Sequence, residues 1–193
     1  MLENLKDYNI ILASESPRRK ELLAGLGINF EIKVLKGIDE SYPDNIPTKE
    51  VAEYISKEKA AAYKDVLNEK DMIITADTVV INGDEILGKP HEKQQAIEML
   101  ENLSDKTHSV VTGVTILTKE KSISFSTETK VDFAKLSEEE INYYIDNYKP
   151  FDKAGAYGIQ EWIGYVAVKS ISGSYFNVMG LPIQRLYQEL KNW

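Results

Sequence analysis

The sequence of 193 residues contains no cysteine, so it has no disulfide bonds, no thiolate metal site and no cysteine nucleophile. Long apolar runs are also missing, because no stretch approaches the roughly 18 apolar residues that a membrane-spanning helix needs. The first residues lack the basic segment and the apolar run of a secretory signal. These absences predict a cytoplasmic protein with no membrane partner.

An excess of positive charge is missing as well. Lys and Arg number 23 against 31 Asp and Glu, which gives a net charge of −8. Proteins that grip long nucleic acids rely on basic surfaces, since phosphate contacts supply most of their affinity. We therefore expect no nucleic acid polymer as a partner. A small polyanion can still bind where a few cations gather in a cleft.

Several motifs of known enzyme classes are absent. The sequence has no GxxxxGK[ST], GxGxxG or GxSxG pattern, so P-loop NTPases, dinucleotide-binding enzymes and serine hydrolases find no support. His91 and His108 lie far apart and lack the spacing of metal ligands. We expect both histidines to be structural.

Strand-like and helix-like segments alternate in a chain whose hydrophobic content of 42% is enough to bury a core. The predicted strands are 9–13, 29–35, one or two strands over 72–81, a long hairpin over 107–133 and 164–171. The predicted helices are 16–26, 48–67, 92–103, 137–148 and 180–192. Interleaved helices and strands with antiparallel hairpins predict an α/β class with a mixed sheet.

Local signals mark the ends of several elements. Ser16 suits an N-cap and Pro17 the first helical position, while Gly27 ends that helix. Ser137 and Glu140 have the spacing of a capping box. The pair Asn82-Gly83 predicts a hairpin turn.

Two consecutive arginines stand at an unfavourable place. Ser16 and Pro17 put Arg18 and Arg19 in the first turn of a helix, where the dipole disfavours a cation by roughly 0.3–1 kcal/mol. Both arginines also lie on the apolar stripe of that helix. A bound phosphate would resolve both conflicts, because guanidinium groups and free helix amides would converge on one anion. The alternative is that both side chains reach solvent or pair with acidic neighbours.

Lys59 and Asp77 each have two interpretations. Lys59 lies in the middle of an apolar helical stripe, so it faces inward or into a cleft, or it extends to the rim. Asp77 follows the buried run MIITA, where a carboxylate is placed to activate water or to hold a cation. It could instead cap a turn or pair with a lysine.

Three further polar residues are weaker candidates. Thr78 offers a hydroxyl to a base or sugar, although strand threonines are usually structural. Lys89, in Gly88-Lys89-Pro90, is either a ligand in a constrained loop or a solvated lysine. In the loop 152–160, the amide of Gln160 could read the edge of a base, but ordinary turn chemistry is the alternative.

Seven motifs in this order resemble the Maf family: LASESPRRKELL, SKEKA, ADTVV, GKP, THSVVTGV, DKAGAYGIQ and GSYFNVMGLP. The resemblance runs from about residue 10 to residue 188. It implies a nucleotide pyrophosphatase that forms a single domain over residues 1–193. The implied fold is an elongated mixed sheet flanked by helices, with two lobes around a central cleft, similar to the inosine triphosphate pyrophosphatases.

The resemblance also implies roles for individual residues. Asp77 matches the catalytic carboxylate, the proton acceptor. The positions that match the triphosphate-binding residues are Ser14, Arg18, Arg19, Lys59 and Lys89. The positions that match residues linked to substrate choice are Arg19, Thr78 and Gln160. The sequence departs from the family pattern at one place. Glu161-Trp162 follows Gln160, where the pattern leads us to expect a glycine-rich continuation.

The loop AGAYGIQ is similar to the branch of the family that prefers dTTP and UTP. We therefore expect hydrolysis of these nucleotides to the monophosphate and pyrophosphate, with Mg²⁺ or Mn²⁺ as cofactor. Glu31, Asp39 and Glu40 are candidate metal ligands. Two alternatives are a pyrophosphatase for 7-methyl-GTP or other modified nucleotides, and a nucleotide-binding regulator of septum formation. A homodimer is expected by family analogy only.

Overall fold

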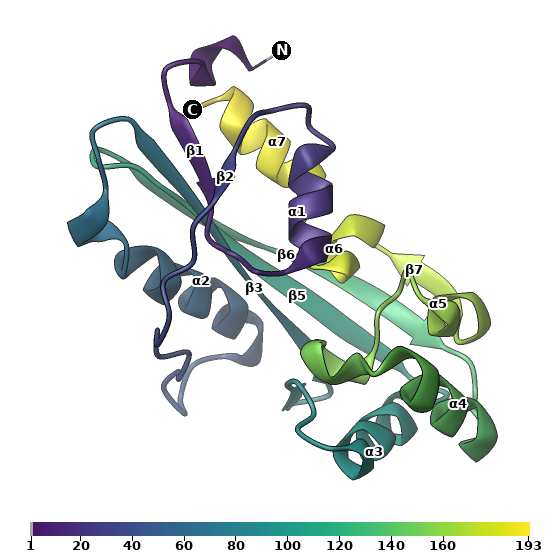
Figure 1. Ribbon diagram of the computed structural model, residues 1–193. Helices are drawn as coiled ribbons and strands as arrows, with labels where there is room; N and C mark the ends of the chain where they lie inside the picture. Colours follow the sequence, from purple (N-terminus) through teal and green to yellow (C-terminus); the bar gives the residue numbers. More distant parts are fainter. Residues whose placement is uncertain (1) are drawn as a thin grey trace. The chain divides into compact units, whose positions relative to one another are not determined.

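The computed structural model describes residues 2–193, in which strands and helices alternate along the chain (Figure 1). The strands are β1 (Asn9–Leu12), β2 (Glu31–Ile32), β3 (Asp71–Asn82), β4 (Glu85–Leu87), β5 (Thr107–Leu117), β6 (Ser122–Phe133) and β7 (Val168–Ser172). The α-helices are α1 (Pro17–Ala24), α2 (Val51–Ala61), α3 (Lys93–Leu103), α4 (Glu138–Tyr148), α5 (Trp162–Val166), α6 (Tyr175–Met179) and α7 (Ile183–Lys191).

Within the described residues, the seven strands form one sheet in the order β2-β1-β3-β5-β6-β7, and β4 pairs with β3. Strand β1 runs parallel to both β2 and β3, while β4 is antiparallel to β3 and β7 is antiparallel to β6. The predicted α/β class with a mixed sheet is therefore confirmed.

The chain divides into two compact units. The first unit comprises the residues up to Asp77, Thr112–Thr127 and Gly180–Trp193. The second unit comprises Thr78–Val111 and Glu128–Met179. Strands β3, β5 and β6 each contribute residues to both units.

The core of the first unit joins the sheet to α2. Ile11 of β1 and Ile73 of β3 are partners in the parallel register, and both pack against Ala60 and Tyr63. Since side chains alternate along a strand, Asp77 points to the same face of β3 as Ile73, which is the face that α2 covers. In Figure 1, the strands of this unit run between α2 and the pair α1 and α7.

The backbone of α2 rests directly on β5 at Gly113. A Cβ atom on Gly113 would lie 2.3 Å from both the carbonyl carbon of Ala52 and the amide nitrogen of Glu53. No real Cβ atom tolerates such a distance, so only glycine permits this approach. The contact fixes the height of α2 above the sheet.

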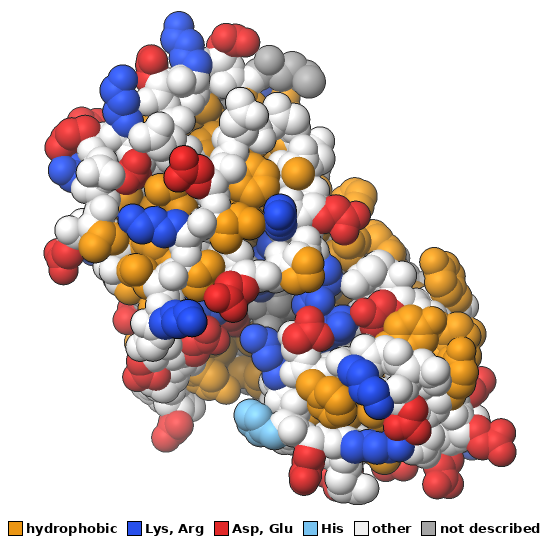
Figure 2. Space-filling view, viewed as in Figure 1, with side chains coloured by type: hydrophobic (Ala, Val, Ile, Leu, Met, Phe, Trp, Pro, Cys, Tyr) orange, Lys and Arg blue, Asp and Glu red, His pale blue; other side chains and the backbone are white. Residues whose placement is uncertain are grey.

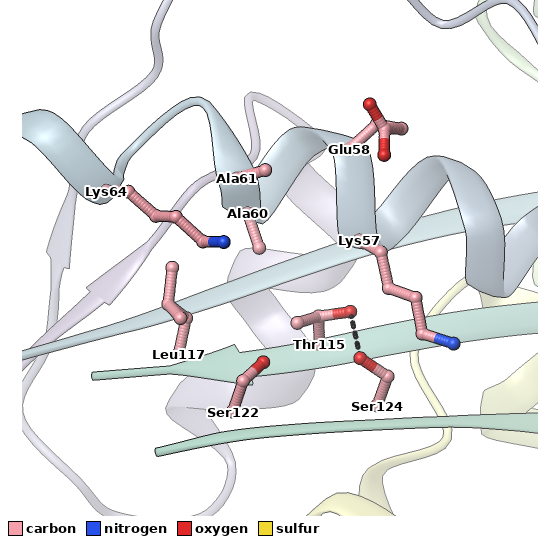
Figure 3. A pocket seen from close by; sticks show the side chains of 9 residues that line it. All are labelled: Lys57, Glu58, Ala60, Ala61, Lys64, Thr115, Leu117, Ser122 and Ser124. Carbon is pink, nitrogen blue, oxygen red and sulfur yellow. Dashed lines mark hydrogen bonds between the residues drawn. The ribbon is translucent and has the colours of Figure 1, made fainter. Parts of the chain in front are cut away.

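A chain of hydroxyl groups also ties α2 to the sheet. The hydroxyl of Ser56 donates to the carbonyl oxygen of Glu53 at 2.8 Å. Its oxygen lies 2.9 Å from Oγ1 of Thr115, which lies 2.9 Å from Oγ of Ser124 (Figure 3). Because a hydroxyl has only one proton, Thr115 must donate to Ser56, and Ser124 must donate to Thr115. The hydroxyl of Thr75 donates separately to the carbonyl oxygen of Ser56 at 2.7 Å.

The predicted strand at 29–35 is wrong in extent, because only Glu31 and Ile32 pair with β1. The amide of Lys33 still donates to the carbonyl oxygen of Leu12 at 3.3 Å, and beyond it the backbone binds a side chain. The hydroxyl of Tyr63 donates to the carbonyl oxygen of Lys33 at 2.8 Å and accepts from the amide of Leu35 at 2.9 Å. These long-range bonds occupy the carbonyl oxygen of Lys33 and the amide of Leu35, so the pairing with β1 does not continue past the amide of Lys33.

The predicted strand at 164–171 is wrong in its first half, which forms α5, and only Val168–Ser172 is a strand. Gly164 lies against the backbone of Ile159, since a Cβ atom there would be 1.7 Å from that carbonyl oxygen. This close approach fixes a helical turn in a segment whose β-branched residues favour a strand. Tertiary packing overrides the local propensity.

Most other predicted elements agree with the structure. Ser16 caps α1 by accepting from the amide of Arg19, and Ser137 forms a capping box at α4 with Glu140. The hairpin turn consists of Gly83 and Asp84, one residue later than predicted. The predicted helix 48–67 is α2 flanked by short 3₁₀ turns, and the predicted helix 180–192 begins only at Ile183.

No helix among residues 2–193 has the length and apolar character needed to cross a bilayer. On the face shown in Figure 2, basic side chains are interspersed with acidic ones and form no continuous basic surface.

Candidate functional site

Lys59 and Asp77 form an ion pair inside the first unit. Lys59 lies near the end of α2, and Asp77 faces that helix from β3. The ammonium nitrogen of Lys59 is 2.8 Å from Oδ1 of Asp77 and 3.1 Å from Oε1 of Glu40. The side chains of Lys59 and Asp77 are each only 14% exposed. Lys59 therefore faces inward and does not extend to the solvent at the rim.

Arg19 bonds to two backbone carbonyl groups from distant parts of the chain. Its Nε donates to the carbonyl oxygen of Gly180 at 2.8 Å, and one terminal nitrogen donates to that of Ala76 at 2.8 Å. The same terminal nitrogen lies 3.4 Å from Oγ of Ser14. Burial lowers the pKa of Arg19 below its ordinary value, while the charge of Asp77 opposes this shift. Arg19 thus holds the residue that precedes Asp77.

Ser14 and Arg18 complete the group of predicted residues in the first unit. Ser14 is 8% exposed, and its hydroxyl oxygen accepts from the amide of Ser16 at 3.2 Å. The half-buried Arg18 lies close enough to Arg19 for its charge to lower the pKa of Arg19, and Glu40 raises that pKa. The first unit therefore brings together five predicted residues: Ser14, Arg18, Arg19, Lys59 and Asp77.

Thr78, Lys89 and Gln160 belong to the second unit. Thr78 follows Asp77 on β3, so its side chain points to the opposite face of that strand. Lys89 is exposed in the loop after β4. The carbonyl oxygen of Gly88 accepts from the amide of Gly155 at 3.0 Å, so the loop of Lys89 lies against the glycine-containing loop. Within residues 2–193, the buried oxygen Oε1 of Gln160 has no hydrogen-bond partner.

The three candidate metal ligands have different environments. Glu31 is exposed on β2. The carboxylate of Asp39 accepts from the amide and the hydroxyl of Ser41, each at 2.9 Å, and these bonds lower its pKa. Of these three carboxylates, only Glu40 contacts the ion pair of Lys59 and Asp77, and it does so through Lys59. No group of three or more acidic or histidine side chains suited to a metal occurs in the described part of the chain.

The contact between Glu40 and Lys59 could not be predicted from the sequence. Glu40 lies in a long irregular segment between β2 and α2, with no periodic pattern to orient its side chain. Its position depends on how that segment passes over the end of α2. The only signal in the sequence was the pair of adjacent acidic residues, Asp39 and Glu40.

A surface pocket of about 470 Å³ lies along α2, β5 and β6, and its lining contains none of the predicted site residues (Figure 3). Its lining residues are Lys57, Glu58, Ala60, Ala61, Lys64, Thr115, Leu117, Ser122 and Ser124. Lys57 is already paired with Glu53 at 2.6 Å. Ser124 has its proton committed to Thr115, so its oxygen only accepts. The pocket therefore offers a phosphate fewer donors than its composition implies.

Fold and site together define an α/β protein. Its first unit places the carboxylate of Asp77 near the ammonium group of Lys59 and the guanidinium group of Arg19. The family model "Maf-like protein" matches residues 9–193. The chain belongs to the Maf family.

Curated relatives match the chain over its whole length. A protein of Parabacteroides distasonis, named dTTP/UTP pyrophosphatase, is 58% identical over 193 residues, which cover 100% of both chains. One of Phocaeicola vulgatus with the same name is 60% identical, covering 99% of each chain. The solved structure of a HAM1 protein from Coxiella burnetii is 15% identical with a TM-score of 0.48, covering 96% of this chain and 100% of that chain. That likeness is too low to carry an argument.

Proposed function

We propose that this chain hydrolyses nucleoside triphosphates, dTTP and UTP foremost, to the nucleoside monophosphate and pyrophosphate. The observation that carries the proposal is the full-length identity of 58% with a relative named dTTP/UTP pyrophosphatase. The group of Ser14, Arg18, Arg19, Lys59 and Asp77 in the first unit supports it. Binding of a triphosphate needs several cationic side chains, and its hydrolysis needs a proton acceptor.

The proposed reaction is attack of water on the α-phosphorus. The water oxygen forms a bond to phosphorus, and the bond from phosphorus to the oxygen bridging the α- and β-phosphates breaks. The electron pair of that bond leaves with pyrophosphate, and Asp77 accepts a proton of the water. The ammonium nitrogen of Lys59, 2.8 Å from Oδ1 of Asp77, holds this carboxylate in a fixed position facing α2.

The basic residues are proposed to bind the phosphates. Arg18 and Lys59 are charged groups of the first unit, and Lys89 of the second unit is assigned to the same task. Positive charge stabilises the leaving pyrophosphate, where negative charge grows in the transition state. Ser14 and Arg19 are assigned to the same group, with Arg19 also holding the carbonyl group before Asp77. Thr78, Gln160 and Arg19 are proposed to select the nucleotide.

A divalent cation, Mg²⁺ or Mn²⁺, fits the residues of this site. Asp77 and Glu40 already share one ammonium group, so their carboxylates converge on a point where a positive charge is favourable. Mg²⁺ typically takes one or two protein carboxylates and completes its shell with water and substrate phosphates. Asp77 and Glu40 would hold the ion, which would supply charge neutralisation at the phosphates.

Hydrolysis in ¹⁸O-labelled water tests the reaction. Attack at the α-phosphorus puts the label in the nucleoside monophosphate, whereas attack at the β-phosphorus puts it in pyrophosphate. Release of pyrophosphate without orthophosphate is expected for dTTP and UTP in buffer with Mg²⁺ or Mn²⁺. Label in pyrophosphate, or release of orthophosphate, would contradict the proposed bond cleavage.

A panel of dTTP, UTP, CTP, ITP and 7-methyl-GTP separates the alternatives. We expect the highest kcat/KM with dTTP and UTP. A preference for 7-methyl-GTP or ITP would favour the modified-nucleotide pyrophosphatase. Binding without turnover would favour the regulator of septum formation. Cytoplasmic location and a homodimer stay predictions.

A further inference from the structure

The loop that contains Gln160 is held by a buried ion pair. The side chain of Lys153 is 9% exposed, and that of Glu161 is 19% exposed. The ammonium nitrogen of Lys153 lies 2.7 Å from Oδ1 of Asp152 and 3.1 Å from Oε1 of Glu161. A buried charge is costly unless it is paired, so removal of one partner disturbs the other.

Tyr144 of α4 extends this pair to the backbone of the loop. Its hydroxyl donates to Oε2 of Glu161 and accepts from the amide of Gly158 at 3.0 Å. Burial raises the pKa of Tyr144 above its ordinary value, as does the bond to Glu161, so the hydroxyl keeps its proton. The charge of Lys153, the carboxylate of Glu161 and the amide of Gly158 therefore form one connected network.

The loop is tightly packed around this network. A Cβ atom on Gly158 would lie 2.9 Å from Cε of Lys153, 3.0 Å from Cδ of Glu161 and 3.2 Å from Nε2 of Gln160. Gly158 and Glu161 flank Gln160 within three residues of chain. The hydroxyl of Tyr144 thus bonds to the backbone amide of Gly158 before Gln160 and to the side-chain carboxylate of Glu161 after it.

This arrangement accounts for Glu161 at a position where the family pattern predicts a glycine-rich continuation. We propose that Glu161 and Tyr144 are positioning residues that orient Gln160 and thereby set which nucleotide base is accepted. The inference rests on the proposed function, since it assigns a determinant of specificity to that reaction. Neither residue needs to touch the substrate, because both act through Gln160.

Tyr144→Phe removes the hydroxyl and leaves the amide of Gly158 without its acceptor. The measurement is kcat/KM for UTP and for GTP, taken as a ratio. We expect that ratio to fall by about tenfold, the order of one unsatisfied buried donor. Glu161→Gln, which keeps an acceptor for Tyr144 but loses the charge toward Lys153, is expected to change the ratio in the same direction.

Measuring Tyr144→Phe in a protein that also carries Gln160→Ala tests whether Tyr144 acts through Gln160. If Tyr144 acts through Gln160, Tyr144→Phe changes the ratio by less than about twofold once Gln160 is absent, since interacting sites are not additive. Tyr143→Phe is the matched control, because it removes the hydroxyl of the neighbouring tyrosine, which is 48% exposed. The control should leave the ratio unchanged.

A second measurement separates this inference from the proposed function. Amide exchange of Gly158, followed by NMR, should accelerate in Tyr144→Phe and not in Tyr143→Phe, whatever reaction the protein performs. A wild-type protein that releases no pyrophosphate would overturn the proposed function. An active wild-type protein whose Tyr144→Phe and Glu161→Gln variants keep the ratio would overturn the inference alone, as would an equal loss with and without Gln160.

Discussion

Asp77 has a lysine ammonium at 2.8 Å and accepts the proton in the proposed reaction. Asp77→Asn keeps the size of the side chain but removes the base, so we expect kcat to fall by about 10²–10⁴-fold. Release of pyrophosphate from dTTP, with circular dichroism to verify folding, measures this. Asp65→Asn, which changes an exposed carboxylate just after α2, is the control and should retain full activity. A folded Asp77→Asn protein with near-normal turnover would refute the role.

The two arginines should differ in their effect on stability. Arg19 binds the carbonyl groups of Ala76 and Gly180, both at buried positions, so Arg19→Ala leaves two acceptors without this donor. We expect a loss of about 1–3 kcal/mol in the free energy of unfolding. Urea denaturation of both variants tests this. Arg18→Ala should mainly lower kcat/KM for the triphosphate, and an equal loss of stability in both variants would contradict the distinction.

At the residue scale, the sequence indicated which side chains are unusual but not what they contact. Arg18, Arg19 and Lys59 were recognisable because each places a charge on an apolar helical stripe, which is a local property. The bonds of Arg19 to the carbonyl groups of Ala76 and Gly180 span 57 and 161 residues of sequence. No local pattern encodes partners so distant in the chain.

Among the elements, α2 carries Lys59, and its distance from the sheet is set at Gly113. Gly113→Ala would place a methyl group 2.3 Å from the backbone of Ala52, which must move. We expect a loss of at least about 1–3 kcal/mol in stability, together with lower turnover as Lys59 withdraws from Asp77. Thermal and urea unfolding measure the first effect. Gly25→Ala, whose Cβ would meet the carbonyl oxygens of Leu22 at 3.2 Å and Glu21 at 3.7 Å, should cost far less.

Elements with local signals were predicted well, and elements shaped by distant contacts were not. The N-termini of α1 and α4 are set by Ser16 and Ser137, whose side chains bond within three residues. The end of β2 depends instead on Tyr63, and the turn of α5 depends on the backbone of Ile159. Sequence periodicity describes one element at a time, so it cannot report what packs against it.

For the molecule as a whole, the buried His108 predicts sensitivity to acid. It is 2% exposed, its Nε2 lies 2.7 Å from the hydroxyl of Tyr157, and burial lowers its pKa to about 4, which Asp132 partly opposes. The unfolded chain binds a proton at this residue below about pH 6.5, but the folded protein binds it only near pH 4. Stability should therefore fall by roughly 3 kcal/mol as the pH drops through this window.

Urea denaturation between pH 7 and pH 4 tests this dependence. His108→Phe, which suits the aromatic neighbours Phe133 and Tyr157, should flatten the slope. His91→Gln is the matched control, because His91 is exposed and its loss should leave the slope unchanged. A slope that persists in His108→Phe would assign the acid sensitivity to other groups.

The hydroxyl chain beneath α2 has a direction, and its members are therefore not equivalent. Ser124 stands at the open end, where the oxygen of Thr115 can take a proton from water in its place. Ser56 stands at the closed end, and its removal leaves the buried hydroxyl of Thr115 without its acceptor. Tolerance to substitution should thus decline from the surface inward, so that drift at Ser124 is permitted while Ser56 is constrained.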